Sequence, residues 1–271
     1  MKKEILLILF FLPLMLFAQE KKMYEFSRFR LGIEAGSDMF NGQTVKNINI
    51  RESQSYYYNF NYYDDLYNCG FMYDSYNYTR YYFGFKPEYS LSLRLAVAAG
   101  VRFSFNKSEF YSDKSYFLWK INEENLTTNY VRVSGIDQNN FYVGVPIEVK
   151  YFTGSSDLFV RQYFKAGMLF NFLASSKSSV HFLNEKMNKY EDNIRGQIGK
   201  PSSLSGYLYL GFGLKIGRMK NPFGTVEIQA PIRVFKNKNL SSFTKEPEAG
   251  FGVQTTLYIP SGKKKLGYPY R

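Results

Sequence analysis

Three segments between residues 204 and 259 alternate apolar and polar residues, and this pattern constrains the fold more than any other feature of the chain. They cover residues 204–217, 224–234 and 248–259. Because successive side chains of a β-strand point to opposite faces, each segment is predicted to be a strand with one apolar and one polar or glycine-lined face. Each has about the length, roughly ten residues, that a tilted strand needs to cross a bilayer. The pattern predicts a transmembrane β-barrel with apolar faces toward lipid and polar faces toward the lumen.

The N-terminus predicts export. Lys2 and Lys3 precede a short apolar run at residues 5–17, and Ala18 is a small residue suited to cleavage. This is the pattern of a signal peptide at residues 1–18, and an uncleaved anchor is the alternative, which the short run disfavours. Residues 19–271 would then form the outer-membrane β-barrel domain.

Composition narrows the functional classes. The chain holds 25 Tyr and 26 Phe, residues that suit strand surfaces and membrane interfaces. The single cysteine, Cys69, excludes an intramolecular disulfide and a cysteine-based metal cluster. Since an exported protein rarely meets nucleic acid, the net charge of +12 favours contact with outer-membrane lipid or lipopolysaccharide, with a solvated basic surface as the alternative.

Five more segments alternate in the same way, at residues 28–36, 81–90, 94–106, 139–152 and 158–175. The connections are alternately long and short. Long loops are predicted near residues 37–80, 107–138, 176–203 and 236–247, and short turns at 90–93, 153–157 and 218–222. A soluble sandwich has no reason to gather every short turn at one end, whereas an outer-membrane barrel does. The sequence therefore predicts an all-β, eight-stranded antiparallel up-and-down transmembrane β-barrel. A hairpin at residues 116–133 would make ten strands instead.

Residues 141–152, FYVGVPIEVKYF, and the turn and strand that follow resemble the PorT-like outer-membrane β-barrel family of Bacteroidota. In that family an aromatic-x-x-x-Pro-apolar strand ends in Lys-Tyr-aromatic before a tight turn. Residues 88–105 and the three lysines at 263–265 are similar too, although the first loop is longer than usual. The resemblance implies the cell outer membrane of a Gram-negative bacterium. Because some members act in protein secretion, it also makes a secretion machine one candidate role.

The faces predicted to line the lumen carry charges of both signs. Side chains in a narrow lumen are expected to pair, because an unpaired charge in a poorly hydrated space is costly. A narrow ion or proton path, or a paired-carboxylate site, is the alternative. The predicted lumen charge network is Arg102, Glu148, Lys150, Arg161, Lys165, Lys215, Glu227 and Arg233, with Arg30, Glu34, Lys86, Glu88, Arg94 and Glu248 on the same faces.

A tyrosine-rich stretch in the first long loop is interleaved with Asn and Asp. Tyrosine gives large contact area at low entropic cost, so the stretch is a candidate binding patch for a protein or glycan. The alternative is that these rings extend the barrel wall or belong to a polar low-complexity loop. The patch comprises Tyr56, Tyr57, Tyr58, Tyr62, Tyr63, Tyr67, Tyr73 and Tyr76.

No catalytic, cofactor-binding or metal-binding residues are predicted. The chain has one histidine, His181, with Ser178 and Ser179 before it, and a lipid-modifying barrel enzyme would depend on it. Phosphate-binding and zinc-protease motifs are absent from the sequence. The expected function is non-enzymatic: binding, scaffolding or secretion through the extracellular loops, with partners at the cell surface or in the periplasm. A lipid-modifying enzyme and a narrow ion channel are the alternatives.

Overall fold

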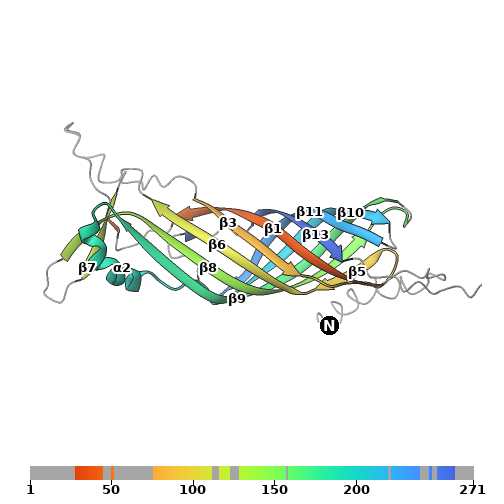
Figure 1. The fold of residues 1–271 in the computed structure, drawn as a ribbon, viewed down its shortest axis with the longest axis horizontal. Coiled ribbons are helices and arrows are strands. Elements are labelled where there is room, and N and C mark those ends of the chain that lie inside the picture. Colours follow the sequence, from red (N-terminus) through yellow and green to blue (C-terminus); the bar gives the residue numbers. More distant parts are fainter. Residues whose placement is uncertain are drawn as a thin grey trace, which may run out of the picture.

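The computed structural model describes residues 28–44, 50–51, 76–111, 116–122, 128–156, 158–218, 221–238, 244–245 and 249–259. Its tilted antiparallel strands close into a long barrel (Figure 1). The ring is closed by the pairing of its first and last strands, β1 and β13. The barrel wall has eight strand positions, which we call staves, and two of them are each formed by two consecutive short strands. In ring order they are β1 (Phe29–Thr44), β3 (Tyr76–Phe85) with β4 (Glu88–Ser90), β5 (Leu95–Ala99) with β6 (Val101–Tyr111), β8 (Thr128–Phe152), β9 (Val160–Phe182), β10 (Leu204–Arg218), β11 (Asn221–Lys236) and β13 (Phe251–Ile259).

Two of the eight staves are interrupted strands. The pairs β3 with β4 and β5 with β6 each keep one register across their break, since Phe85 pairs with Val101 and Glu88 with Ala98. Pro87 lies in the first break, where its missing N–H cannot join the ladder. The chain turns at residues 91–94, where the Ser92 hydroxyl accepts hydrogen bonds from the N–H groups of Arg94 and Leu95. This places the turn where the sequence predicts it.

The faces of the barrel have the predicted polarity. On β8, Ile147 is 49% exposed on the outer face, whereas its neighbour Glu148 is 3% exposed and lies inside. The same alternation holds on β9, where Phe164 is exposed and Lys165 is buried. Burying charge and exposing apolar side chains is stable only if hydrocarbon surrounds the outer face. The protein is therefore built as a transmembrane barrel.

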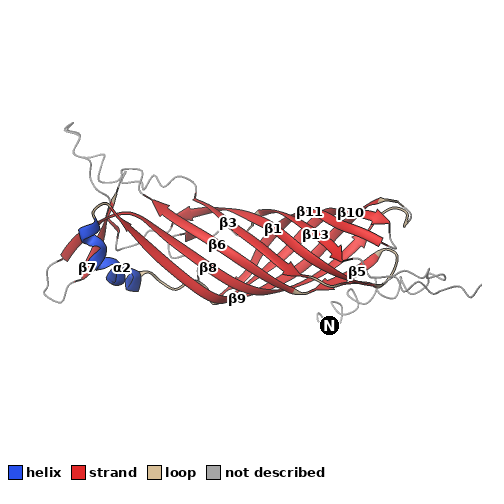
Figure 2. Ribbon diagram, viewed as in Figure 1, coloured by secondary structure: helices blue, strands red, loops and turns tan. Residues whose placement is uncertain are grey.

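Strands β8 and β9 continue beyond the barrel, at the end that carries the long connections. β8 has 25 residues and β9 has 23, and they stay paired as far as Val133 and Phe182. Figure 2 shows the helical segment and β7 (Phe117–Asn122) at this end. The helical segment comprises a 3-10 helix, η1 (Glu185–Tyr190), and α2 (Glu191–Gln197). Two further short strands, β2 (Ile50–Arg51) and β12 (Thr244–Lys245), pair with β7 and β1. The strands thus run further into the predicted loop ranges than the sequence analysis expects.

This projecting part has a hydrophobic core of its own. We call it the cap, comprising residues 110–111, 116–122, 128–136 and 180–198. Its buried core is formed by Phe110, Phe117, Trp119, Ile121, Val131, Val133, Ile136, Val180, Ile194 and Ile198. The last two come from the α2 region, which covers the inner face of the strands, and the Trp119 indole donates to the Gln197 side chain at 2.7 Å.

The hairpin at residues 116–133 forms but does not add staves to the barrel. β7 pairs with the start of β8, from Phe117 with Val133 to Asn122 with Thr128, and its other neighbour is β2. The barrel therefore has eight strands, not ten. Among the residues that the structure describes, none belongs to a helix that is both long and apolar enough to cross a membrane. The predicted signal peptide lies outside the described residues.

Candidate functional site

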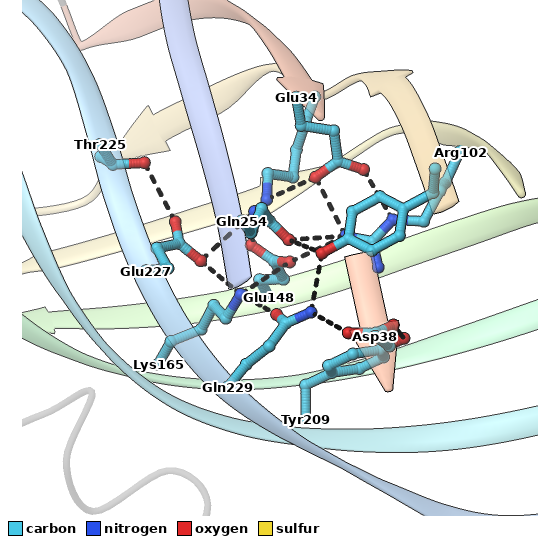
Figure 3. Close-up of polar contacts among 12 residues, drawn as sticks. Glu34, Asp38, Arg102, Glu148, Lys165, Tyr209, Thr225, Glu227, Gln229 and Gln254 are labelled. Atoms are coloured by element: carbon cyan, nitrogen blue, oxygen red, sulfur yellow. Dashed lines mark hydrogen bonds and ion pairs between the residues drawn. The ribbon is translucent and has the colours of Figure 1, made fainter. Parts of the chain in front are cut away.

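One continuous network of ion pairs runs through the lumen, and Figure 3 shows part of it. Glu227 lies at its centre: Lys150 contacts it at 3.0 Å, Lys165 forms an ion pair with it, and the Tyr163 hydroxyl donates to it at 2.5 Å. Glu148 joins Lys86 at 2.7 Å and Lys165 at 3.6 Å. All of these side chains are buried, so each charge depends on its partners and not on water.

The network continues toward both ends of the barrel. In one direction Lys86 bonds Glu34 at 2.7 Å, and Arg102 binds the same carboxylate through two nitrogens at 2.7 and 3.0 Å. In the other direction Glu88 accepts from Lys215 at 2.8 Å and Arg30 at 3.2 Å. Paired charges of this kind fill a narrow barrel without leaving an isolated buried ion.

Asp38 and Arg80 form a second group nearer the cap. Arg80 donates to Asp38 at 2.6 and 3.1 Å, and Tyr209 and Gln229 donate to the same carboxylate. The sequence pattern places Asp38 and Arg80 in the first loop, so neither is predicted to line the lumen. The available signal was the inward parity, which continues from Glu34 to Asp38 and from Tyr82 back to Arg80.

Glycines on the lumen faces make room for this network. A Cβ on Gly213 would lie 2.5 Å from the ring of Tyr163, whose hydroxyl reaches Glu227. A Cβ on Gly252 would lie 2.0 Å from an Asp38 oxygen. The glycine-lined polar faces of the sequence therefore have a packing reason: a larger residue would displace a partner of the network.

Aromatic layers bracket the charges along the barrel. On β8, Tyr142 lies on the cap side of Glu148 and Lys150, and Phe152 lies on their short-turn side. Tyr142 belongs to a buried cluster with Phe40, Leu169, Tyr207 and Tyr209, whereas Phe152 packs on Ala96 and Tyr163. Cations also stack on these layers, with Arg80 4.2 Å from the Tyr207 ring centroid and Lys215 4.8 Å from that of Phe152.

The structure brings six of the eight predicted network residues together in ion pairs: Arg102, Glu148, Lys150, Lys165, Lys215 and Glu227. The surroundings of the other two are different. Arg161 is buried at the short-turn end, where it donates to the Leu93 carbonyl at 3.0 Å. Arg233 is half-buried on β11, next to a bulge in its pairing with β10.

The predictions for Arg94, Glu248 and the tyrosine patch have other outcomes. Arg94 is exposed at the turn and does not line the lumen. Glu248 and seven tyrosines of the predicted binding patch, Tyr56, Tyr57, Tyr58, Tyr62, Tyr63, Tyr67 and Tyr73, lie outside the described residues. Tyr76 begins β3, and its side chain is not described.

The apolar outer band ends at a sharp level on β6, β8 and β9. On β8 it runs from Phe141 to Tyr151, which at about 3.3 Å per residue and a tilt of ~45° gives a band roughly 23 Å tall, close to a bilayer's apolar thickness. Aromatic side chains edge the band at the short turns, including Phe29, Tyr89, Tyr151, Phe159 and Phe223. At the cap side, Phe105 and Phe141 pack with ring centroids 4.9 Å apart.

Directly above these rings lies a polar surface of three rungs, which we call the interface patch. Its first rung is Lys107, Asn139 and Lys177, its second Glu109, Asp137 and Ser179, and its third Tyr111, Gly135 and His181. Each rung crosses three neighbouring strands in direct register. Asp137 is its centre, because it accepts from the Tyr111 hydroxyl at 2.9 Å and lies 3.1 Å from Nε2 of His181.

His181 is therefore on the outer face of β9, two rungs beyond the rung that borders the apolar band. Ser179 shares this face, whereas Ser178 is buried on the opposite face. Among the described residues no hydrogen bond joins His181 to either serine. The side chain that sequence analysis named for an enzyme thus contacts a carboxylate and a phenol.

The ring of hydrogen-bonded strands, the apolar outer band and the ion-paired interior define a transmembrane β-barrel whose lumen is filled by side chains. No protein-family model and no curated protein matches the sequence. Among solved structures, the N-terminal β-barrel domain of Pseudomonas aeruginosa OprF is similar, at 10% identity and a TM-score of 0.30, over 85% of this chain and 97% of that one. The barrel assignment rests on the geometry above and not on this likeness.

Proposed function

We propose that this protein is a non-enzymatic outer-membrane β-barrel that anchors a binding or scaffold module, the cap, outside the membrane. One observation carries the proposal: the lumen is occupied by paired charges, whereas the strands that leave the membrane build a second hydrophobic core. A protein that only needed to span the membrane would have no use for that core. The short turns would face the periplasm and the cap the cell surface.

A channel is disfavoured by the same geometry. The network carboxylates and their partners have side-chain exposures of 6% or less and are bracketed by aromatic clusters. Moving an ion through would require separating pairs such as Lys86 and Glu148 in a poorly hydrated space. In planar bilayers the full-length protein is expected to give no discrete conductance steps. Regular steps would restore the channel reading.

The role in a secretion machine that the PorT-like resemblance implies is a finer version of this proposal. It predicts a protein partner at the cap. Photo-crosslinking residues placed at Leu183 and Tyr130, which are exposed on the cap, should give a discrete protein adduct in intact cells. The matched control is Phe164, exposed on the barrel wall, which should crosslink only to lipid. Equal adducts from all three positions, or none from the cap, would refute a cap-based role.

The enzyme alternative has its own test. His181→Ala removes the only histidine of the chain. If the protein is not an enzyme, membranes that contain this variant should turn over phospholipid and lipid A at the wild-type rate. A loss of turnover that tracks His181 and Ser179 together, with Ser178→Ala as the control, would instead establish a hydrolase on the interface patch.

A further inference from the structure

The interface patch orders its charges along the strands. Lys107 and Lys177 are exposed on the rung next to the apolar band, and Glu109 and Asp137 form the rung above. Lys107 also forms an ion pair with Glu109, so the two rungs are within reach of one another. With His181 neutral the patch has no net charge, but the rung next to the apolar band is positive and the next rung along the strands is negative. This order rules against a simple anion site and complements a zwitterionic headgroup.

The spacing of the rungs suits a particular headgroup. Residues two apart on one strand face lie about 6.6 Å apart along it, which is about 5 Å along the membrane normal at a tilt of ~45°. In phosphoethanolamine two methylene groups separate the phosphate from the ammonium, a comparable span. The phosphate would meet the lysines of the first rung, and the ammonium would meet the carboxylates of the second.

The third rung favours an ammonium group as well. The Tyr111 ring lies against the backbone of Gly135, where an added Cβ would be 2.3 Å from it. His181 packs beside it with ring centroids 6.2 Å apart. These rings flank Asp137, and aromatic faces attract cations. Tyr111 contacts Oδ1 of Asp137 and His181 contacts Oδ2, so each oxygen keeps a second acceptor site for an N–H donor.

Aromatic side chains directly below can hold the acyl chains. Phe83, Phe103, Phe105 and Phe141 form a connected outward cluster, with ring centroid distances of 4.9 to 6.3 Å. We propose that the interface patch is a binding site for the phosphoethanolamine headgroup of a membrane lipid. Lys107 and Lys177 bind its phosphate, Glu109 and Asp137 its ammonium, and the phenylalanines its chains. The site depends on the membrane boundary and not on a partner of the cap.

Lipid retention tests the assignment in the intact protein. The full-length barrel is incorporated into nanodiscs with equal amounts of phosphatidylethanolamine, phosphatidylcholine and phosphatidylglycerol. It is then extracted in mild detergent, and the retained lipids are quantified by mass spectrometry. Phosphatidylethanolamine should exceed phosphatidylcholine by about five-fold, because a quaternary ammonium cannot donate to a carboxylate. Equal retention of these two lipids, or dominance of phosphatidylglycerol, would overturn the site.

Two double variants separate the halves of the site. Glu109→Gln with Asp137→Asn should abolish the preference for phosphatidylethanolamine over phosphatidylcholine. The total amount of phospholipid retained by this variant should stay at the wild-type level. Lys107→Gln with Lys177→Gln should lower retention of all three lipids. Lys238→Gln, an exposed lysine beyond β11, is the matched control and should change neither quantity. Heat-modifiable gel migration verifies folding of each variant. A carboxylate variant that folds and keeps the wild-type preference would also refute the proposal.

Discussion

Strand β8 passes through the barrel and the cap, and its two parts bury opposite kinds of side chain. In the barrel part, Glu148 and Lys150 are buried, whereas Ile147 is 49% exposed. In the cap part, Val131 and Val133 are buried and Arg132 is exposed. The backbone and its pairing to β9 run through both parts, with bulges at Val133/Gly135 and Phe141/Tyr142. The solvent outside the strand, hydrocarbon for one part and water for the other, decides which face is apolar.

The comparison also explains why each part is stable. The cap contains a small hydrophobic core, in which burial of Trp119, Phe117 and their neighbours is driven by the hydrophobic effect. The barrel interior gains little from that effect and relies on satisfied ion pairs and hydrogen bonds. Damage in the two regions should therefore have different consequences, and the following predictions go from the largest effect to the smallest.

Removing the central carboxylate should cause the greatest loss. Glu227→Leu leaves the buried Lys150 and Lys165 without their shared partner, which costs about 3–5 kcal/mol. The free energy of unfolding by urea in lipid vesicles measures the effect. Arg218→Leu, an exposed cation at the end of β10, is the control and should be near neutral. Equal stability of the two variants would mean that the lumen does not need its ion pairs.

A charge on the outer band should be tolerated only at its edge. Ile147 is close to the middle of the band, so Ile147→Lys is expected to cost about 2–4 kcal/mol in a bilayer. Asn139→Lys, on the first rung of the interface patch, should cost about 0–1 kcal/mol. Vesicle-folding titrations of both variants measure the difference. Similar costs at the two positions would show that the membrane boundary does not lie between them.

A carboxyl group in the cap core should unfold the cap and spare the barrel. In Val131→Asp the buried carboxyl group is expected to take up a proton, and the neutral group without a hydrogen-bond partner costs about 1–3 kcal/mol. The chain has one tryptophan, Trp119, and it lies in the cap core, so its emission reports the cap alone. The variant should shift that emission to longer wavelength while heat-modifiable migration stays normal. Arg132→Asp, on the exposed neighbour, should leave the emission unchanged, and loss of barrel migration in Val131→Asp would contradict two separate cores.

The smallest effect is expected at the interface patch. Tyr111→Phe removes the hydrogen bond to Asp137 and keeps the ring against Gly135, so the cap should lose about 1 kcal/mol or less. Denaturation followed by Trp119 emission provides the measurement. A loss as large as that of Val131→Asp would mean that the patch supports the cap core.

The sequence predicts the barrel better than the cap, for a physical reason. Alternation over whole strands, as from Phe141 to Tyr151, is a long-range pattern that one environment imposes. The cap core combines short pieces from β6, β7, β8 and β9 with a helical segment, and a bulge near Gly135 shifts the alternation on β8. Each piece is too short to reveal its buried face, so residues 176–203 were expected to be a loop.

The candidate sites show the same limit. Strand parity alone places the side chains of Glu227 and Lys165 inside the lumen, where charges are expected to pair. The first predicted strand ends at residue 36, so the ion pair of Asp38 with Arg80 is not predicted. The interface patch could not be predicted at all, since Tyr111, Asp137 and His181 meet only through the registers of three strands. The sequence singles out His181 as the one histidine of the chain but does not predict its partners.

The most direct test of the account is the solvent exposure of spin labels placed along β8, in a Cys69→Ala background. Outward positions 143 to 151 should be accessible to oxygen and protected from a water-soluble nickel reagent. Positions 139, 137 and 132 should show the reverse, and inward positions 148 and 150 should be reached by neither. Access of the nickel reagent at 145 to 149, or oxygen access that continues unchanged past 139 into the cap, would contradict a barrel in lipid with a cap in water.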